Sequence, residues 1–320
     1  MSEIYLVFVV FLFVLAVFDL MVGVSNDAVN FLNSAIGAKV AKFRTIIIVA
    51  AVGVFMGATM SNGMMEVARN GVFHPAMFSL KELMFIFLAV MISDVILLDI
   101  FNNLGLPTST TVSLVFELLG GTTAFVLLKL ANDTTGLTVG DLMNTEKALG
   151  MIMAIFVSVA IAFFFGIVLQ YISRLVFTFT YKKNLKWKIG IFGGVATTAI
   201  FYFMLFKGIK SMSFVTPEIY EYIQSHTLAI LGICFLASTA LMQVLYFLKV
   251  NVFKVLVLMG TFALAMAFAG NDLVNFIGVP LAGYSSYIDF ASSGATDPGS
   301  FMMSSLDGPA KSPLIFLIAA

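Results

Sequence analysis

Two matched polar stretches decide the fold of this chain: Ser25-Asn26-Asp27-Ala28-Val29-Asn30-Phe31 and Gly270-Asn271-Asp272-Leu273-Val274-Asn275-Phe276. Both contain N-D-x-x-N-F in the same register, and both come at the end of a long apolar stretch. Asn and Asp are rare at membrane depth, because a polar or charged side chain is costly there. Two matched polar clusters are therefore a stronger sign of an internal repeat than matched leucines would be.

Composition places the rest of the chain in a lipid bilayer. Of 320 residues, 61% are hydrophobic and 11% are charged, whereas a soluble domain carries about 25% charged residues. The formal net charge is zero, which gives no reason to expect a nucleic-acid partner. Stretches long enough to span a bilayer as helices are Ile4–Val24, Thr45–Ser61, Leu83–Asn102, Thr111–Leu130, Ala148–Phe177, Ile189–Phe206, Thr227–Leu248 and Phe253–Ala269. They are continuously apolar, unlike the alternating strands of a barrel, so we expect an all-α, polytopic transmembrane helix bundle.

Basic residues orient this bundle. They follow alternate spans, at Lys39, Lys42 and Arg44, then Lys182, Lys183, Lys186 and Lys188, then Lys249 and Lys254. The positive-inside rule puts these turns in the cytoplasm and the N-terminus outside, in what we expect to be a bacterial inner (plasma) membrane. The two polar motifs then lie on oppositely directed helices.

Oppositely directed motifs are typical of the inverted-topology repeats of secondary transporters, which have broken or re-entrant helices at their binding sites. We therefore divide the chain into three regions. Residues 1–180 form the first inverted repeat, 181–250 form connecting transmembrane helices, and 251–320 begin the second repeat.

Several carboxylates lie within or beside the spans, at Asp19, Asp27, Asp94, Asp99, Glu117 and Asp272. They must face protein, water or a cation, because ionised carboxylates facing lipid would oppose insertion. Asp27 and Asp272 are the best candidates for cation ligands, with neutral oxygens supplied by Asn26, Asn30, Asn271 and Asn275. Interhelical hydrogen bonding is the alternative for these motif residues, and it is the favoured interpretation for Asp19 and Asp99. Glu117 fits a proton relay or a buried hydrogen bond equally well.

A second constellation is Gly105-Leu106-Pro107-Thr108-Ser109-Thr110-Thr111, which interrupts an apolar hairpin. Proline stops the preceding helix and fits just before the start of a new one. Ser109, Thr110 and Thr111 would then occupy a helix N-terminus at membrane depth. Free backbone N–H groups and the positive end of the helix dipole bind an oxyanion there without arginine. An ordinary N-cap in a tight turn is the alternative.

The sequence gives no sign of an enzyme or of a bound cofactor. Cys234 is the only cysteine, so neither an intrachain disulfide nor a cysteine-based metal site can form. No HExxH, nucleophile elbow, Walker loop or Rossmann fingerprint occurs in the chain.

With these motifs the sequence resembles the inorganic phosphate transporter (PiT) family. That family has a duplicated G-x-N-D-x-x-N signature in inverted halves and a P-x-S-T-T segment in each half. The resemblance implies uptake of inorganic phosphate by alternating access, with sodium or protons as the coupling ion, in what looks like a homodimer. Phosphate would be bound by Asn26, Asp27, Ser109, Thr110, Thr111, Asn271 and Asp272. Sodium would be bound by Asp27, Asn30, Asp272 and Asn275.

The chain also departs from the family pattern. Val112 stands where many members have His, and no second P-x-S-T-T follows Gly270. Since an apolar run begins again at Pro313–Ala320, we expect further helices in a longer natural chain. Two alternatives stay open: a permease of the same family for sulfate or another oxyanion, and an anion channel.

Overall fold

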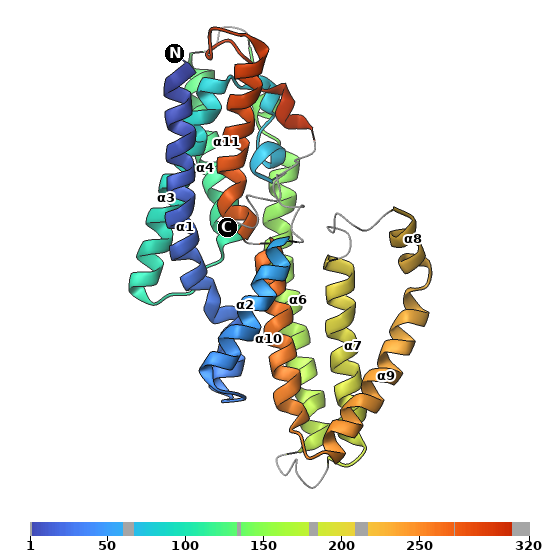
Figure 1. Cartoon of the computed structure of the whole chain (residues 1–320). Helices are drawn as coiled ribbons and strands as arrows, with labels where there is room; N and C mark the ends of the chain where they lie inside the picture. Colours follow the sequence, from blue (N-terminus) through green and yellow to red (C-terminus); the bar gives the residue numbers. More distant parts are fainter. Residues whose placement is uncertain are drawn as a thin grey trace. The chain divides into compact units, whose positions relative to one another are not determined.

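The computed structural model describes residues 2–59, 67–132, 136–178, 185–208, 217–271 and 273–308, which form helices joined by turns (Figure 1). Helices long and apolar enough to cross a membrane are Glu3–Gly37, Leu80–Leu104, Thr110–Ala131, Thr145–Phe177, Thr227–Phe247 and Val252–Ser293, the last running over residue 272. Shorter apolar helices are Phe43–Thr59 and Lys188–Met204. The predicted class, an all-α bundle of membrane-spanning helices, is confirmed.

The described chain divides into two compact units. The first unit contains Met1–Val29, Ser61–Ile155 and Gly270–Ala320, and the second contains Asn30–Met60 and Phe156–Ala269. Helices α1 (Ser2–Gly37) and α6 (Thr145–Phe177) contribute residues to both. These units reflect packing, whereas the division at 1–180, 181–250 and 251–320 concerns the repeat and stays a prediction.

Helix boundaries differ from the sequence prediction near the two polar motifs. The first span was predicted to end at Val24, but α1 continues through the first motif to Gly37. Nothing between Val24 and Gly37 forces a helix to stop, because no proline occurs there and the buried Asn26 bonds to Asn102 on α3 (Leu80–Leu104) and to Leu106 in the turn after it. Helix α11 (Leu273–Ser293), which follows the second motif, was not predicted, because Pro280 and several polar residues interrupt its apolar pattern.

In the first unit, α1 packs with α3 (Leu80–Leu104), α4 (Thr110–Ala131) and α11 around one apolar core. Helices α1 and α11 are antiparallel, because Leu12 lies against Gly283 while Gly23, further along α1, lies against Phe276 near the start of α11. Figure 1 shows the same arrangement, with α1 and α11 running in opposite directions. The first motif copy lies on α1 and residues 273–276 of the second copy lie on the oppositely directed α11, in agreement with the predicted inverted repeat.

Short segments close one end of the first unit. They are η1 (Val67–Gly71), η2 (Pro75–Met77), α5 (Val139–Leu142) and η5 (Ser304–Asp307). Backbone hydrogen bonds join them: Leu80 N–H donates to Phe301 O at 2.9 Å, and Met303 N–H donates to Phe78 O at 3.0 Å. Segments far apart in the sequence are held together here, which fixes the start of α3 against the chain after α11.

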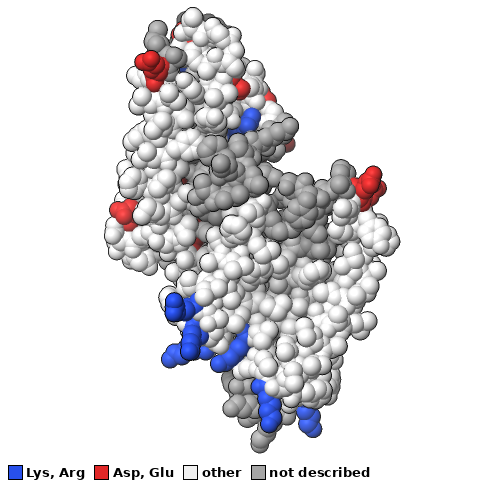
Figure 2. Space-filling model, viewed as in Figure 1, with Lys and Arg blue, Asp and Glu red and all other residues white. Residues whose placement is uncertain are grey.

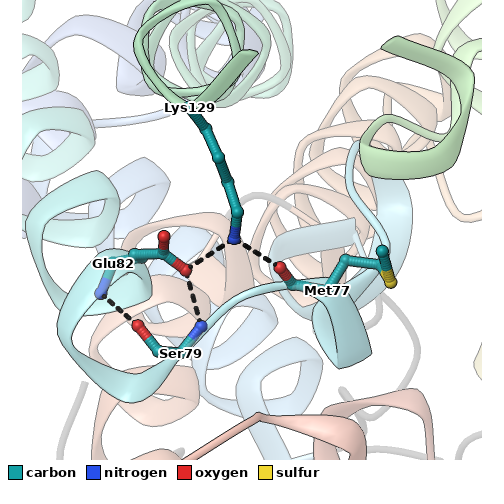
Figure 3. Close-up of polar contacts among 4 residues, drawn as sticks. All are labelled: Met77, Ser79, Glu82 and Lys129. Carbon is teal, nitrogen blue, oxygen red and sulfur yellow. Dashed lines mark hydrogen bonds and ion pairs between the residues drawn. The ribbon is translucent and has the colours of Figure 1, made fainter. Parts of the chain in front are cut away.

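The start of α3 is also tied to the end of α4 (Figure 3). Ser79 and Glu82 form a capping box, in which Ser79 N–H donates to Glu82 Oε2 at 2.8 Å and Glu82 N–H donates to Ser79 Oγ at 3.3 Å. Lys129 Nζ, on the last turn of α4, donates to the same Glu82 Oε2 at 3.0 Å and to Met77 O at 2.8 Å. One lysine thereby satisfies a carboxylate and a backbone carbonyl at this end.

Replacing Lys129 by methionine should lower the melting temperature in detergent, because Glu82 and the Met77 carbonyl both lose a donor. The two charged side chains are 20% and 22% exposed, so water screens the pair and the expected loss is about 1 kcal/mol. Lys254→Met, the same change at an exposed position, serves as the control and should leave the melting temperature unchanged. Equal melting temperatures for the two variants would contradict this role for Lys129.

The second unit contains the end of α1, α2 (Phe43–Thr59), most of α6, α7 (Lys188–Gly208), α8 (Pro217–Ser225), α9 (Thr227–Phe247) and α10 (Val252–Asn271). Helices α2 and α10 approach closely at Gly53 and Gly57. A Cβ at Gly53 would lie 2.6 Å from Phe262 O, and one at Gly57 would overlap Met266 O. Small residues four apart permit such backbone contact between membrane helices.

Basic side chains gather at one end of the second unit, over the turns after α1 and α9 (Figure 2). Away from this end, the visible face of the second unit carries few charged side chains, as a surface that faces lipid requires. Lys182 and Lys183 lie outside the described residues. The cytoplasmic location of this end and the external N-terminus stay predictions.

Candidate functional site

The turn between α3 and α4 forms the helix N-terminus that the sequence predicted. Helix α3 ends at Gly105, whose φ of 67° lies in the left-handed region and whose N–H donates to Asn102 O at 3.0 Å. Helix α4 begins at Thr110, with Ser109 as the N-cap residue accepting from Val112 N–H at 3.4 Å. A non-glycine residue would be strained at position 105, so glycine permits the tight reversal.

Asn26, from the first motif, holds this turn in place. Its Nδ2 donates to Asn102 Oδ1 and to Leu106 O, each at 2.9 Å, and its Oδ1 accepts from Thr108 N–H at 2.9 Å. Asn102 Nδ2 in turn donates to Val22 O at 2.8 Å. Both Nδ2 hydrogens of Asn26 are used, so in this conformation it has no donor left for an anion. Asn26 is therefore a positioning residue for the turn.

The second motif reaches the same helix end. Asn275, which is 3% exposed, donates from Nδ2 to Thr111 Oγ1 at 2.8 Å. The neighbouring Phe276 ring packs directly on Gly23, where a Cβ would overlap the ring. The structure thus brings Asn26 to the turn before α4 and Asn275 to the first turn of α4, from antiparallel helices.

The first turn of α4 presents polar groups that the chain itself does not fully use. The first helical hydrogen bond joins Ser113 N–H to Ser109 O at 2.9 Å, so the preceding N–H groups lie outside the helical ladder. Thr110 is 1% exposed, and its Oγ1 has no hydrogen-bond partner within the described part of the chain. A buried hydroxyl without a partner is costly, so a ligand that accepts its hydrogen bond would stabilise the site. Ser109 is exposed, which leaves this turn accessible.

The other predicted site residues lie elsewhere on α1 or outside the described residues. Asp27 follows Asn26 on α1 and is 3% exposed. Asn30 lies one turn further along α1 and is exposed, at the start of the second unit. Asp272 lies outside the described residues, as does the side chain of Asn271. The α4 N-terminus therefore gathers Asn26, Ser109, Thr110, Thr111 and Asn275 from the predicted set.

Within the described ranges, no group of three or more His, Cys, Asp or Glu side chains is placed to hold a metal ion. Sodium does not require such a group, since hard cations also bind amide and backbone carbonyl oxygens. The donor types in the two motifs, a carboxylate beside carboxamides, suit such an ion.

A sequence model described as the phosphate transporter family matches residues 23–313. This chain belongs to that family. Among solved structures it is similar to one described as "The sodium-dependent phosphate transporter", with a TM-score of 0.68 and 19% identity over 98% of this chain and 72% of that chain. At this identity the likeness shows the fold alone. No curated protein sequence matches the chain.

Membership of the phosphate transporter family agrees with the motifs, but sequence reasoning missed one residue that shapes the turn. The sequence prediction places Asn102 only at the end of a span, yet its side chain bonds to Asn26 and to Val22 O. The sequence feature that could have indicated this role is a carboxamide three residues before Gly105 of the Gly-x-Pro turn. The sequence favours an interhelical hydrogen bond for Asp99, but this side chain is exposed and accepts from Asn103 Nδ2 at 3.1 Å on the same helix. An interhelical bond of Asp99 is not seen among the described residues.

Proposed function

We propose that this phosphate transporter family member carries inorganic phosphate across the membrane together with sodium, by alternating access. The observation that carries the proposal is the meeting of both motif copies at the N-terminus of α4, through Asn26 and Asn275. Secondary transporters built from inverted repeats place substrate at such helix ends. The description of the solved relative, a sodium-dependent phosphate transporter, favours the same substrate and ion.

Phosphate would be held by the first turn of α4. The backbone N–H groups of Thr110 and Thr111 precede the helical ladder, and the dipole of α4 favours negative charge at this end. The hydroxyls of Ser109, Thr110 and Thr111 add donors that match the oxygens of a tetrahedral oxyanion. Asn26 fixes the turn, and Asn275 orients the Thr111 hydroxyl. In the proposed site these two asparagines act through the residues that contact phosphate.

Sodium would balance the charge that phosphate brings. Asp27 is buried next to Asn26 on α1, so an anion bound at this turn would approach a carboxylate. As a general scale, two negative charges about 4 Å apart repel by about 4 kcal/mol at an effective dielectric constant of about 20. A cation bound with phosphate turns this repulsion into attraction, which makes binding of the two interdependent. We assign sodium to Asp27 and Asn30 in the first motif and to Asp272 and Asn275 in the second. Asn271 and Asp272 would complete the phosphate site.

Uptake into liposomes tests the proposal. With the purified protein inserted, an inward sodium gradient should drive saturable accumulation of labelled phosphate, and excess sulfate should not compete. Accumulation driven by a proton gradient but not by sodium would reject the coupling ion. Competition by sulfate at equal concentration would reject the phosphate specificity. Unsaturable flux that needs no gradient would indicate a channel and contradict the proposal as a whole.

A further inference from the structure

Three acidic side chains meet inside the first unit, on helices that also form the candidate phosphate site. Asp19 on α1 and Asp94 on α3 are 0% and 2% exposed, and Glu117 on α4 is half-buried. Asp19 interacts electrostatically with both other residues of this acidic triad. Asp19 lies two turns before Asn26 and Glu117 lies two turns after Thr110, about 10 Å along each helix. The triad is therefore separate from the α4 N-terminus.

The hydroxyl of Ser113 joins two members of the acidic triad. Its Oγ lies 2.7 Å from Asp94 Oδ1 and 2.8 Å from Glu117 Oε1, both at hydrogen-bonding distance. A serine hydroxyl has one hydrogen and can donate to only one carboxylate at a time. The other short oxygen–oxygen contact is favourable only if that carboxyl group is protonated and its O–H donates to Ser113. This geometry requires at least one proton on Asp94 or Glu117.

Asp19 gives an independent reason for a bound proton. Neither of its carboxyl oxygens makes a hydrogen bond at ordinary geometry, although the side chain is completely buried and faces Asp94. An ionised carboxylate in a dry interior without donors is very costly, and such a group becomes neutral instead. A proton on Asp19 removes the charge and supplies the missing hydrogen bond toward Asp94.

No cation of the surrounding helices takes the place of that proton in the described part of the chain. Among the described residues, the strongest side-chain influences on the acidic triad come from its own members and from Ser113. Helix α11, which packs on α3 and α4, has Tyr284, Tyr287 and Asp289 as its titratable groups and contains no basic residue. The lysines of α3 and α4 lie at the helix ends, where Lys129 pairs with Glu82.

We propose that Asp19, Asp94 and Glu117, with Ser113, form a proton-binding site that holds at least one proton at neutral pH. The assigned ligand is a proton, because the contacts at Ser113 have hydrogen-bonding distances of 2.7 and 2.8 Å, and within the described ranges no three acidic side chains are placed to hold a metal ion. The site is assigned from its own geometry, so it stands whether or not the protein couples phosphate to sodium.

Infrared spectroscopy of the purified protein at neutral pH tests this site without a transport assay. Protonated carboxyl groups have a C=O stretching band that ionised ones lack, and the band shifts in deuterated water. The double variant Asp19→Asn/Glu117→Gln should lose the triad's contribution to this band, since Asp94 can then accept from Ser113 as a carboxylate. Each single substitution should also weaken the band. Asp99→Asn, an exposed carboxylate on α3, should leave it unchanged.

The amides are neutral and nearly isosteric with protonated carboxyls, so we expect these variants to fold, and thermal melting checks this. A wild-type spectrum without the band, or an equal band in the wild type and all triad variants, would overturn the assignment. Loss of the band on adding sodium, but not potassium, would also overturn it, because the site would then bind a metal cation in place of the proton.

Discussion

Sodium-driven phosphate uptake should fall by at least roughly 100-fold when Asp27 or Asp272 is replaced by alanine, a loss of about 2.8 kcal/mol. Each substitution removes the one ionic ligand that its motif offers to the proposed sodium site. Leaving a buried charge without its partner costs about 2–5 kcal/mol, and here the cation and the phosphate would lose their interaction together. The measurement is initial uptake of labelled phosphate into liposomes under a sodium gradient.

Membrane insertion should survive both substitutions, because removing an Asp from a span makes insertion easier by about 2.5–3.5 kcal/mol. Asp99→Ala, which removes an exposed carboxylate from α3, is the control and should keep uptake within a factor of about two. Normal sodium-dependent uptake by both the Asp27 and Asp272 variants would contradict the assigned sodium site.

Replacing Asn26 by alanine should reduce uptake by at least roughly tenfold while the protein remains folded. Three hydrogen bonds are lost, to Asn102, Leu106 and Thr108, and each is worth about 0.5–1.5 kcal/mol. The turn before α4 would then no longer be held in one conformation, and its donors would no longer be preorganised for the anion. Uptake kinetics would show the effect mainly as weaker apparent affinity for phosphate.

Two further variants separate this effect from a general loss of stability. Asn26→Asp keeps the acceptor for Thr108 N–H, but it loses both donors and adds a negative charge close to the phosphate site, so its uptake should fall at least as far as that of the alanine variant while its melting temperature stays closer to that of the wild type. Ser25→Ala changes the neighbouring exposed residue and should have no effect. Unchanged phosphate affinity in Asn26→Ala would show that this asparagine does not position the binding turn.

Sequence patterns predicted the membrane helices well, because an apolar stretch in lipid must satisfy its backbone hydrogen bonds internally and can hardly avoid being helical. The helix start at Thr110 was also predictable, since Pro107 and the hydroxyl residues after it act locally. The end of α1 could not be predicted in the same way. Whether a polar motif ends a membrane helix depends on partners from other helices, and Asn26 finds them on α3 and in the turn after it.

The same limit applies to the candidate site. Sequence spacing predicted the matched motifs, and the antiparallel α1 and α11 agree with the inverted arrangement, which stays a prediction. Sequence spacing could not show that the side chain of Asn26 makes all its hydrogen bonds to the turn before α4, or that Asn275 bonds to Thr111. These contacts join segments that are distant in the sequence. Nor could it assemble Asp19, Asp94 and Glu117, which come from three helices. Only Ser113 and Glu117, one helical turn apart on α4, were visible neighbours in the sequence.

The most direct test of the central claim is a structure of the protein determined with sodium and arsenate, a phosphate analogue whose arsenic is located by anomalous scattering. We expect the arsenic peak at the N-terminus of α4, with arsenate oxygens within hydrogen-bonding distance of the Thr110 hydroxyl and the first backbone N–H groups of that helix. An arsenate bound elsewhere in the protein, with the first turn of α4 empty at saturating concentration, would contradict the account.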